Sequence, residues 1–278
     1  MSGSRAGSAA VVSALAVITS VVTACSPTGP GTPAADDNGP VPTLSVEVVD
    51  VHPHDADAFT QGLEIDGNRL YESTGRVGES WVRSTELGSV PGSGPEIARA
   101  DLAPPLFGEG ITVFGNSLWQ LTWKNGVAIV RDKDTLVERD TFPLTTQGWG
   151  ICALEDRLVT SDGSSTLTFH DPDTFDATGS VDVTRDGKPL SNLNELECTD
   201  DGMVYANVWQ TDTIVSIDPE DGQVTSVIDA SPLRARLNTD GSTHTVDVLN
   251  GIAQIPGTDR FLLTGKYWPQ IFDVRFVA

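Results

Sequence analysis

Five short phrases recur along this chain with nearly the same pattern of residues. Each places a polar or aromatic residue before a position that is usually glycine, and an apolar residue follows. The phrases are Thr60-Gln61-Gly62-Leu63, Gly108-Glu109-Gly110-Ile111, Gly148-Trp149-Gly150-Ile151, Leu193-Asn194-Glu195-Leu196 and Leu249-Asn250-Gly251-Ile252. From Gly62 the steps are 48, 40, 45 and 56 residues, a spacing typical of repeat architectures. Because the residue before the glycine position varies, we expect one scaffold that carries a different side chain at this point in most repeats.

Each phrase opens a predicted strand, and turn residues then lead to a second strand. The second strands are predicted at residues 70–75, 118–123, 158–163, 204–209 and 261–266. Third and fourth strands follow before the next phrase, and no sustained helical periodicity interrupts them. Four short antiparallel strands in about 45 residues are typical of a propeller blade. The sequence therefore predicts an all-β fold, a five-bladed β-propeller with four antiparallel strands per blade.

The two ends of this domain are expected to complete each other. The last repeat ends at residues 271–277 after only three strands, whereas residues 44–51 alternate as a strand before the first phrase. We expect this N-terminal segment to supply the missing outer strand of the last blade. Such a closure leaves no open sheet edge.

The N-terminus has the features of a targeting segment. Arg5 precedes a weakly apolar run at residues 9–24, which is typical of a signal-peptide core. The run ends in Val22-Thr23-Ala24-Cys25, which resembles the lipobox of bacterial lipoproteins and implies cleavage before Cys25 and lipidation of its sulfur. The alternative is an ordinary secretory signal in which Cys25 is incidental. Residues 1–24 are thus predicted as a lipoprotein signal peptide, 25–43 as a disordered Pro/Gly-rich tether and 44–278 as the propeller.

The charge balance restricts the partners. The chain has 39 acidic and 17 basic residues and a formal net charge of −22 at pH 7. Such a surface repels phosphate backbones, so nucleic acid is not an expected partner. We expect an extracytoplasmic monomer that is anchored to the membrane only through its lipid, or a secreted protein if Cys25 is not modified.

Cysteines and acidic turns leave several structural alternatives open. Cys152 and Cys198 follow the third and fourth phrases and are expected on neighbouring inner strands, where export permits a disulfide. Two buried thiols, or a metal site, are the alternatives. No histidine spacing indicates a metal site. The turn at Asp132-Lys133-Asp134 has the ligands for a structural Ca²⁺, although such carboxylates more often bind backbone N–H groups.

The antiparallel connection of the first two strands in each repeat predicts a binding site. Since the second strand returns to the face where the first begins, strand starts and strand ends meet at one mouth. The residues expected there are Phe59, Gln61, Glu109, Trp123, Trp149, Asn194, Trp209, Asn250 and Lys266. Taken singly, such tryptophans usually pack between blades, and such Glu and Lys side chains are usually solvated. Together at one mouth, they indicate a site in which partial burial raises the pKa of Glu109.

An ordered set of motifs resembles the plant/bacterial-type glutaminyl cyclases, the glutamine cyclotransferase family, over about residues 51–276. The motifs are Ala58-Phe59-Thr60-Gln61-Gly62-Leu63, Leu70-Tyr71-Glu72-Ser73-Thr74-Gly75, Phe107-Gly108-Glu109-Gly110-Ile111-Thr112, Gln120-Leu121-Thr122-Trp123, Gly148-Trp149-Gly150, Ser161-Asp162-Gly163-Ser164, Leu193-Asn194-Glu195-Leu196-Glu197, Ala206-Asn207-Val208-Trp209, Leu249-Asn250-Gly251-Ile252 and Thr264-Gly265-Lys266-Tyr267-Trp268-Pro269. Gln147 departs from the pattern, which more often has an acidic residue there. The resemblance implies a five-bladed propeller.

The resemblance also implies conversion of N-terminal glutamine of peptides or proteins to pyroglutamate, with no required cofactor. It implies Glu109 as the acid–base group, with Asn194 and Gln61 on the substrate amide and oxyanion and Lys266 on a peptide carbonyl. The aromatic substrate-binding residues would be Phe59, Trp123, Trp149 and Trp209. No role beyond structural support is assigned to Asn250, and the loop at residues 231–247 is expected to limit substrate size.

Two other classes of protein remain as alternatives at this point. One is a non-catalytic propeller lipoprotein that binds a ligand or protein at the same mouth, although a binder has no need of a proton shuttle. The other is a propeller lyase or lactonase. Those enzymes rely on histidine or metal at the channel, and the predicted mouth has neither.

Overall fold

The computed structural model describes residues 39–88 and 94–278. The predicted signal peptide, the lipidation residue Cys25 and most of the predicted tether lie outside these residues. Within them the chain forms strands throughout, together with one short 3-10 helix at Ser231–Arg236. The described residues include no helix that is long and apolar enough to cross a membrane. The prediction of an all-β fold is therefore confirmed.

Three sheets each contain four consecutive antiparallel strands. The first consists of β2 (Thr60–Asp66), β3 (Arg69–Thr74), β4 (Trp81–Glu86) and β5 (Glu96–Asp101). The second consists of β6 (Gly108–Phe114), β7 (Ser117–Thr122), β8 (Val127–Asp132) and β9 (Glu138–Pro143). The third consists of β10 (Ile151–Ala153), β11 (Leu158–Thr160), β12 (Thr166–His170) and β13 (Ala177–Asp182).

The remaining long strands form one eight-stranded sheet with two four-stranded halves. One half contains β16 (Leu193–Cys198), β17 (Val204–Val208), β18 (Thr213–Ile217) and β19 (Val224–Asp229). The other contains β20 (Leu249–Gln254), β21 (Arg260–Gly265), β22 (Gln270–Val277) and β1 (Thr43–Pro53). A small hairpin of β14 (Thr184–Arg185) and β15 (Lys188–Pro189) lies outside these sheets.

The N-terminal strand joins the two halves of the eight-stranded sheet. β1 pairs antiparallel with β22 along most of its length, and its first residues pair parallel with β19. It therefore lies in the outer position that the sequence predicts for residues 44–51. The residue before β1 also contacts this sheet, because Pro42 O accepts a hydrogen bond of 2.9 Å from Val227 N.

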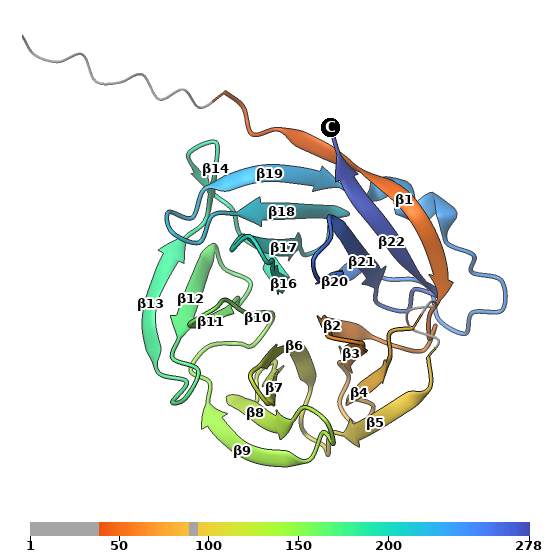
Figure 1. Ribbon diagram of the computed structural model, residues 1–278, viewed down its shortest axis with the longest axis vertical. Coiled ribbons are helices and arrows are strands. Elements are labelled where there is room, and N and C mark those ends of the chain that lie inside the picture. Colours follow the sequence, from red (N-terminus) through yellow and green to blue (C-terminus); the bar gives the residue numbers. More distant parts are fainter. Residues whose placement is uncertain (1–38, 89–93) are drawn as a thin grey trace, which may run out of the picture. The chain divides into compact units, whose positions relative to one another are not determined.

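The sheets surround a common centre (Figure 1), and the first strand of each repeat lies innermost. These inner strands are β2, β6, β10, β16 and β20, and each contacts the next until β20 returns to β2. Glycine in the repeated phrase lets the backbones of neighbouring inner strands come this close. A Cβ atom on Gly110 would lie 2.8 Å from Gly150 Cα, and one on Gly150 would lie 2.1 Å from Asn194 O. The recurring glycine is thus where neighbouring inner strands touch.

The fourth phrase has Glu195 in place of glycine, and its side chain connects inner strands across the centre. Its two carboxylate oxygens accept hydrogen bonds from Leu63 N at 3.1 Å and Ile252 N at 2.9 Å. These donors lie on β2 and β20. Glu195 therefore links strands from the first, fourth and fifth repeats.

The apolar core lies between neighbouring sheets. One cluster of buried side chains combines residues of β10, β11 and β12 with residues of β16–β19, and it contains Cys152. Cys152 and Cys198 form a disulfide with 5.3 Å between their Cα atoms. The sequence left open whether these cysteines pair; in the structure the bond joins two inner strands, β10 and β16.

The acidic turn considered for calcium binds its own backbone. Asp132 Oδ1 accepts hydrogen bonds from Asp134 N at 3.1 Å and from Thr135 N at 2.8 Å. Among the residues described, no group of three or more His, Cys, Asp or Glu side chains is arranged to hold a metal ion. The turn carboxylate thus has a structural function in the chain itself.

Candidate active site

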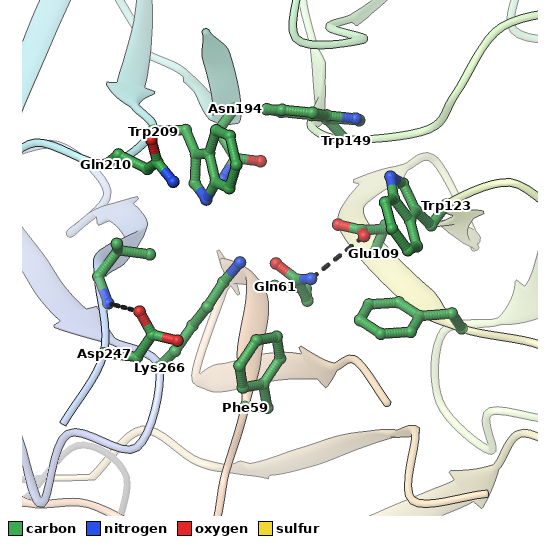
Figure 2. A pocket seen from close by; sticks show the side chains of 12 residues that line it. Phe59, Gln61, Glu109, Trp123, Trp149, Asn194, Trp209, Gln210, Asp247 and Lys266 are labelled. Atoms are coloured by element: carbon green, nitrogen blue, oxygen red, sulfur yellow. Dashed lines mark hydrogen bonds between the residues drawn. The ribbon is translucent and has the colours of Figure 1, made fainter. Parts of the chain in front are cut away.

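A cavity of about 320 Å³ opens at the mouth formed by the inner strands. All eight side chains that the sequence assigns to catalysis and substrate binding line it (Figure 2). They are Phe59, Gln61, Glu109, Trp123, Trp149, Asn194, Trp209 and Lys266. The wall also contains Phe107, Gln210, Asp247 and Val248, which sequence reasoning missed as site residues. Asn250 was expected at the mouth as well, but it is fully buried and does not line the cavity.

Strand direction explains why these residues meet. Gln61, Glu109 and Asn194 lie at the starts of the inner strands β2, β6 and β16. Trp123 directly follows β7, and Lys266 directly follows β21, the antiparallel partners of inner strands β6 and β20. Starts of first strands and ends of second strands therefore share one face, as the repeat pattern predicts.

Glu109 is a buried carboxyl group at the wall of the cavity, with 4% of its surface exposed. Gln61 Nε2 donates a hydrogen bond of 3.1 Å to its Oε1 atom. Burial raises the pKa of Glu109 well above its usual range, and the positive charge of Lys266 only partly offsets this effect. A buried carboxyl group with a raised pKa holds a proton more readily than a solvated one, as a general acid–base group requires.

Lys266 is the cation of the site, and it too is buried, with 5% of its surface exposed. Its Nζ atom lies 4.8 Å from the ring centroid of Phe59, a cation–π distance. Burial lowers the pKa of the Lys266 ammonium, while Glu109 and Asp247 favour the charged form. Lys266 has no acidic partner within ion-pair distance among the described residues, so its ammonium can bind a substrate oxygen.

Aromatic rings form the remaining walls. Trp149 and Trp209 meet edge to face with 5.4 Å between ring centroids, and Phe107 lies 5.5 Å from Trp123 and 6.3 Å from Phe59. Trp123 is 36% exposed and therefore lies at the rim. The cavity is thus a small aromatic box, which Gln61, Glu109 and Asn194 enter from the inner strands.

The long segment between the fourth and fifth phrases contributes an edge of the cavity. Residues 247 and 248 pair with the end of β21 through Asp247 N to Lys266 O at 2.9 Å and Lys266 N to Val248 O at 3.0 Å. The indole of Trp268 also donates to Asp247 O at 3.0 Å. The sequence pattern predicts a loop here, but it has no feature that places Asp247 beside Lys266.

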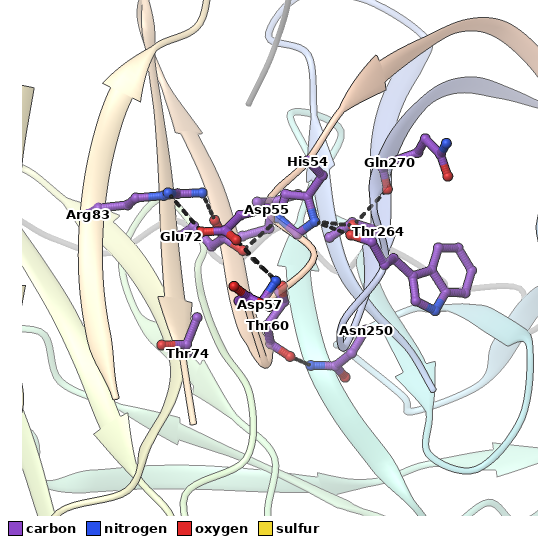
Figure 3. Close-up of polar contacts among 12 residues, drawn as sticks. His54, Asp55, Asp57, Thr60, Glu72, Thr74, Arg83, Asn250, Thr264 and Gln270 are labelled. Atoms are coloured by element: carbon purple, nitrogen blue, oxygen red, sulfur yellow. Dashed lines mark hydrogen bonds and ion pairs between the residues drawn. The ribbon is translucent and has the colours of Figure 1, made fainter. Parts of the chain in front are cut away.

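A second polar cluster includes Thr60, the residue before Gln61 in the chain (Figure 3). The Glu72 carboxylate accepts hydrogen bonds from His54 Nε2 at 2.8 Å, Thr60 Oγ1 at 2.8 Å and an Arg83 nitrogen at 2.9 Å. His54 also bonds Trp268 O through Nδ1 at 2.6 Å. Both ring nitrogens of His54 face acceptors, which favours the imidazolium form. This cluster connects the N-terminal segment with the first repeat and the last repeat.

Comparisons with known proteins agree with this geometry. The family model for glutamine cyclotransferase matches residues 17–276. The glutaminyl-peptide cyclotransferase of Arabidopsis thaliana is 39% identical over 232 residues, which are 83% of this chain and 71% of that protein. The crystal structure of Myxococcus xanthus glutaminyl cyclase superposes with a TM-score of 0.77 at 37% identity, covering 86% of this chain and 99% of that one. The chain belongs to the glutamine cyclotransferase family.

Proposed function

We propose that this protein is a glutaminyl-peptide cyclotransferase, an acyltransferase that converts N-terminal glutamine of peptides or proteins to pyroglutamate. Membership of the glutamine cyclotransferase family supports this activity. The observation that carries the proposal is the buried Glu109 carboxyl in a cavity that also holds Lys266 and the carboxamides of Gln61, Asn194 and Gln210. A site that only binds peptides has no need of a carboxyl group prepared to exchange protons.

The reaction requires one bond to form and one to break. The α-amine of the substrate attacks the carbon of its own γ-carboxamide, and the bond from that carbon to the amide nitrogen then breaks and releases ammonia. The Glu109 carboxylate takes a proton from the attacking amine and returns it to the departing nitrogen. Acid–base help of this kind typically contributes on the order of 10²–10⁴-fold.

The other residues hold the substrate in the conformation that cyclises. The Gln61 and Asn194 side chains hydrogen-bond the substrate amide and the oxyanion that develops on the γ-carbonyl oxygen. Lys266 binds a carbonyl oxygen of the peptide. Phe59, Trp123, Trp149 and Trp209 enclose the glutamine side chain and exclude water, so attack by the amine prevails over hydrolysis. Because the attack is intramolecular, orientation is a large part of the acceleration.

The fold that supports this site is proposed to be a five-bladed propeller. Each half of the eight-stranded sheet counts as one blade, and the three separate sheets supply the others. The closed sequence of contacts among the inner strands supports this count. In this arrangement β1 closes the ring as the outer strand of the last blade.

Export and anchoring complete the proposal. Residues 1–24 are proposed to direct export, Cys25 to carry the lipid, and the following residues up to about 43 to hold a monomeric domain away from the membrane. Secretion without an anchor is the alternative. The substrates would then be exported peptides or proteins that begin with glutamine. No cofactor takes part in the proposed chemistry.

A direct assay tests the activity. The purified protein is incubated with a peptide that begins with glutamine, and mass spectrometry follows the loss of one ammonia beyond the rate without enzyme. A peptide whose N-terminal glutamine is acetylated is the control, because its nitrogen cannot attack. We expect conversion of the free peptide only. Binding of the free peptide without conversion would instead establish a non-catalytic peptide-binding protein.

A further inference from the structure

Asn250 occupies the variable position of the fifth repeat, but it does not line the cavity. It is fully buried, and its side chain lies between two residues that do line the cavity, Gln61 and Asn194. Asn194 Nδ2 donates to Asn250 Oδ1 at 2.8 Å, and Asn250 Nδ2 approaches Gln61 Oε1 at 3.4 Å. The three carboxamides form a chain that ends at Glu109 through the bond from Gln61.

The direction of this chain is fixed by a backbone group. Asn250 Nδ2 also donates to Thr60 O at 3.1 Å. A carbonyl oxygen can only accept, so Asn250 must direct its NH₂ group toward Thr60 and its oxygen toward Asn194. Asn194 must therefore present its NH₂ group to Asn250. Gln61, which meets Asn250 through its oxygen, must present its own NH₂ group to Glu109.

The consequence for the cavity is a defined set of donors. Asn194 and Gln61 each use one amide hydrogen within the chain, and each keeps a second hydrogen on the same nitrogen. Among residues 39–88 and 94–278, neither nitrogen donates to a second acceptor. If either amide turned over, it would present a carbonyl oxygen in place of this donor and would repel the developing oxyanion.

We propose that Asn250 is a positioning residue for cyclisation, which fixes the amide orientation of Asn194 and Gln61 so that both keep a donor for the substrate. This inference rests on the proposed function. Asn250 itself touches no substrate. The neighbouring Asn207 holds the backbone at this point, since its Oδ1 atom accepts from Gly251 N at 3.0 Å, and Asn250 is thereby kept in place.

The test compares Asn250→Ala with the wild-type protein on a glutamine-initiated peptide, after correction for the folded fraction. We expect kcat to fall by about 10- to 100-fold, because a misplacement of donor groups by about 1 Å reduces the rate by up to about this factor. KM should change much less, since the aromatic walls are intact. Gln120→Ala is the matched control. Gln120 is also a fully buried carboxamide that bonds another side chain, Arg131, and it does not line the cavity.

Two further measurements separate positioning from simple destabilisation. In a background that already carries Gln61→Ala and Asn194→Ala, Asn250→Ala should have little additional effect on kcat, because its partners are gone. In the single variant the acidic limb of the kcat/KM profile should move to higher pH, since Gln61 no longer holds the ionised Glu109. Lys266 is the charged group that faces Glu109, with Asp247 beside Lys266, and both are unchanged in this variant.

The outcomes are distinguishable. An inactive wild-type protein overturns the proposed function. An active wild-type protein whose Asn250→Ala variant has normal kcat and an unchanged pH profile overturns the positioning role alone, even if the variant melts at a lower temperature. If Asn250→Ala does not fold, Asn250→Asp replaces it. The ionised aspartate keeps the shape and the acceptor for Asn194 but has no donor for Thr60 O, so above the pKa of this carboxyl we expect the same loss of kcat.

Discussion

Gln61 Nε2 donates a hydrogen bond of 3.1 Å to Glu109 Oε1, although the two residues are 48 positions apart in the sequence. They occupy the same position of the first and second repeats, at the starts of β2 and β6. The bond favours the ionised form of a carboxyl group whose pKa burial raises well above its usual range. Glu109 is therefore held where, in the proposed mechanism, it accepts and returns a proton.

Replacing Glu109 with glutamine should nearly abolish cyclisation, with a loss of kcat on the order of 10²–10⁴-fold. The fold should remain and gain stability. A carboxyl group whose folded-state pKa is raised favours the fold when protonated, and this contribution is lost as the pH rises through the unfolded and then the folded pKa. At neutral pH, Glu109→Gln should therefore melt at the same temperature as the wild type or higher. Glu220→Gln, at an exposed turn, is the control. Normal turnover in Glu109→Gln would rule out the proton-transfer role.

Replacing Lys266 with methionine should affect both rate and pH dependence. Because the Lys266 charge lowers the pKa of Glu109, its loss should raise that pKa further and move the acidic limb of kcat/KM to higher pH. Loss of the cationic donor that positions the peptide carbonyl should also reduce kcat/KM, on the order of 10²-fold. Steady-state kinetics across a pH series measure both effects. Lys188→Met, at an exposed position, should behave as the wild type. If the acidic limb of the kcat/KM profile did not move in Lys266→Met, the charge of Lys266 would not affect the pKa of Glu109.

Replacing Glu72 with glutamine should destabilise the protein. His54 and Arg83 would keep their positive charges in a buried cluster without the carboxylate, and such a loss typically costs about 3–5 kcal/mol. Urea unfolding at neutral pH measures this change, with the exposed Glu96→Gln as the control. If the free energy of unfolding changed no more than in the control, the cluster would not stabilise the contact of the N-terminal segment with the first and last repeats.

The same cluster should give the wild-type protein a recognisable dependence on pH. Burial opposes ionisation of Glu72, but His54 and Arg83 outweigh burial and lower its pKa from 4.5 to about 2. Its stabilisation is thus complete above pH about 4.5 and lost as the pH falls toward about 2. Burial also opposes the charged form of His54, yet Glu72 and Trp268 O raise its pKa above 6.5. That contribution is complete below pH about 6.5 and is lost as the pH rises through the raised value. Melting curves over this range should show the acidic decline in the wild type and a smaller one in Glu72→Gln.

Reduction of the disulfide between Cys152 and Cys198 should lower the free energy of unfolding by about 2–4 kcal/mol. The bond closes a segment with a sequence separation of 46 residues and restricts the unfolded chain. Thermal melts with and without reductant measure the effect. A variant in which both cysteines are alanine should melt at one temperature under both conditions. Cyclisation by the folded variant should persist, because neither cysteine lines the cavity.

The repeated phrase predicted much of this molecule because its constraints are local. Glycine at Gly62, Gly110 and Gly150 marks the contacts between inner strands, and turn residues mark the hairpins that return each chain to the mouth. From these features alone, Glu109 and Lys266 could be placed in one site. Asp247 could not, because it lies at the end of a loop that has no repeat pattern.

The sequence by itself determined the strands, their antiparallel order and the set of side chains that share the mouth, since alternation, turns and repeat spacing are properties of neighbouring residues. Only the tertiary structure decided how those side chains act on one another. Glu109 is buried only because side chains of other repeats surround it. The disulfide between Cys152 and Cys198 joins two different repeats. The hydrogen-bonded chain from Asn194 through Asn250 to Gln61 joins three. Such contacts depend on distances and orientations across the centre of the molecule, which arise only when the repeats pack around it.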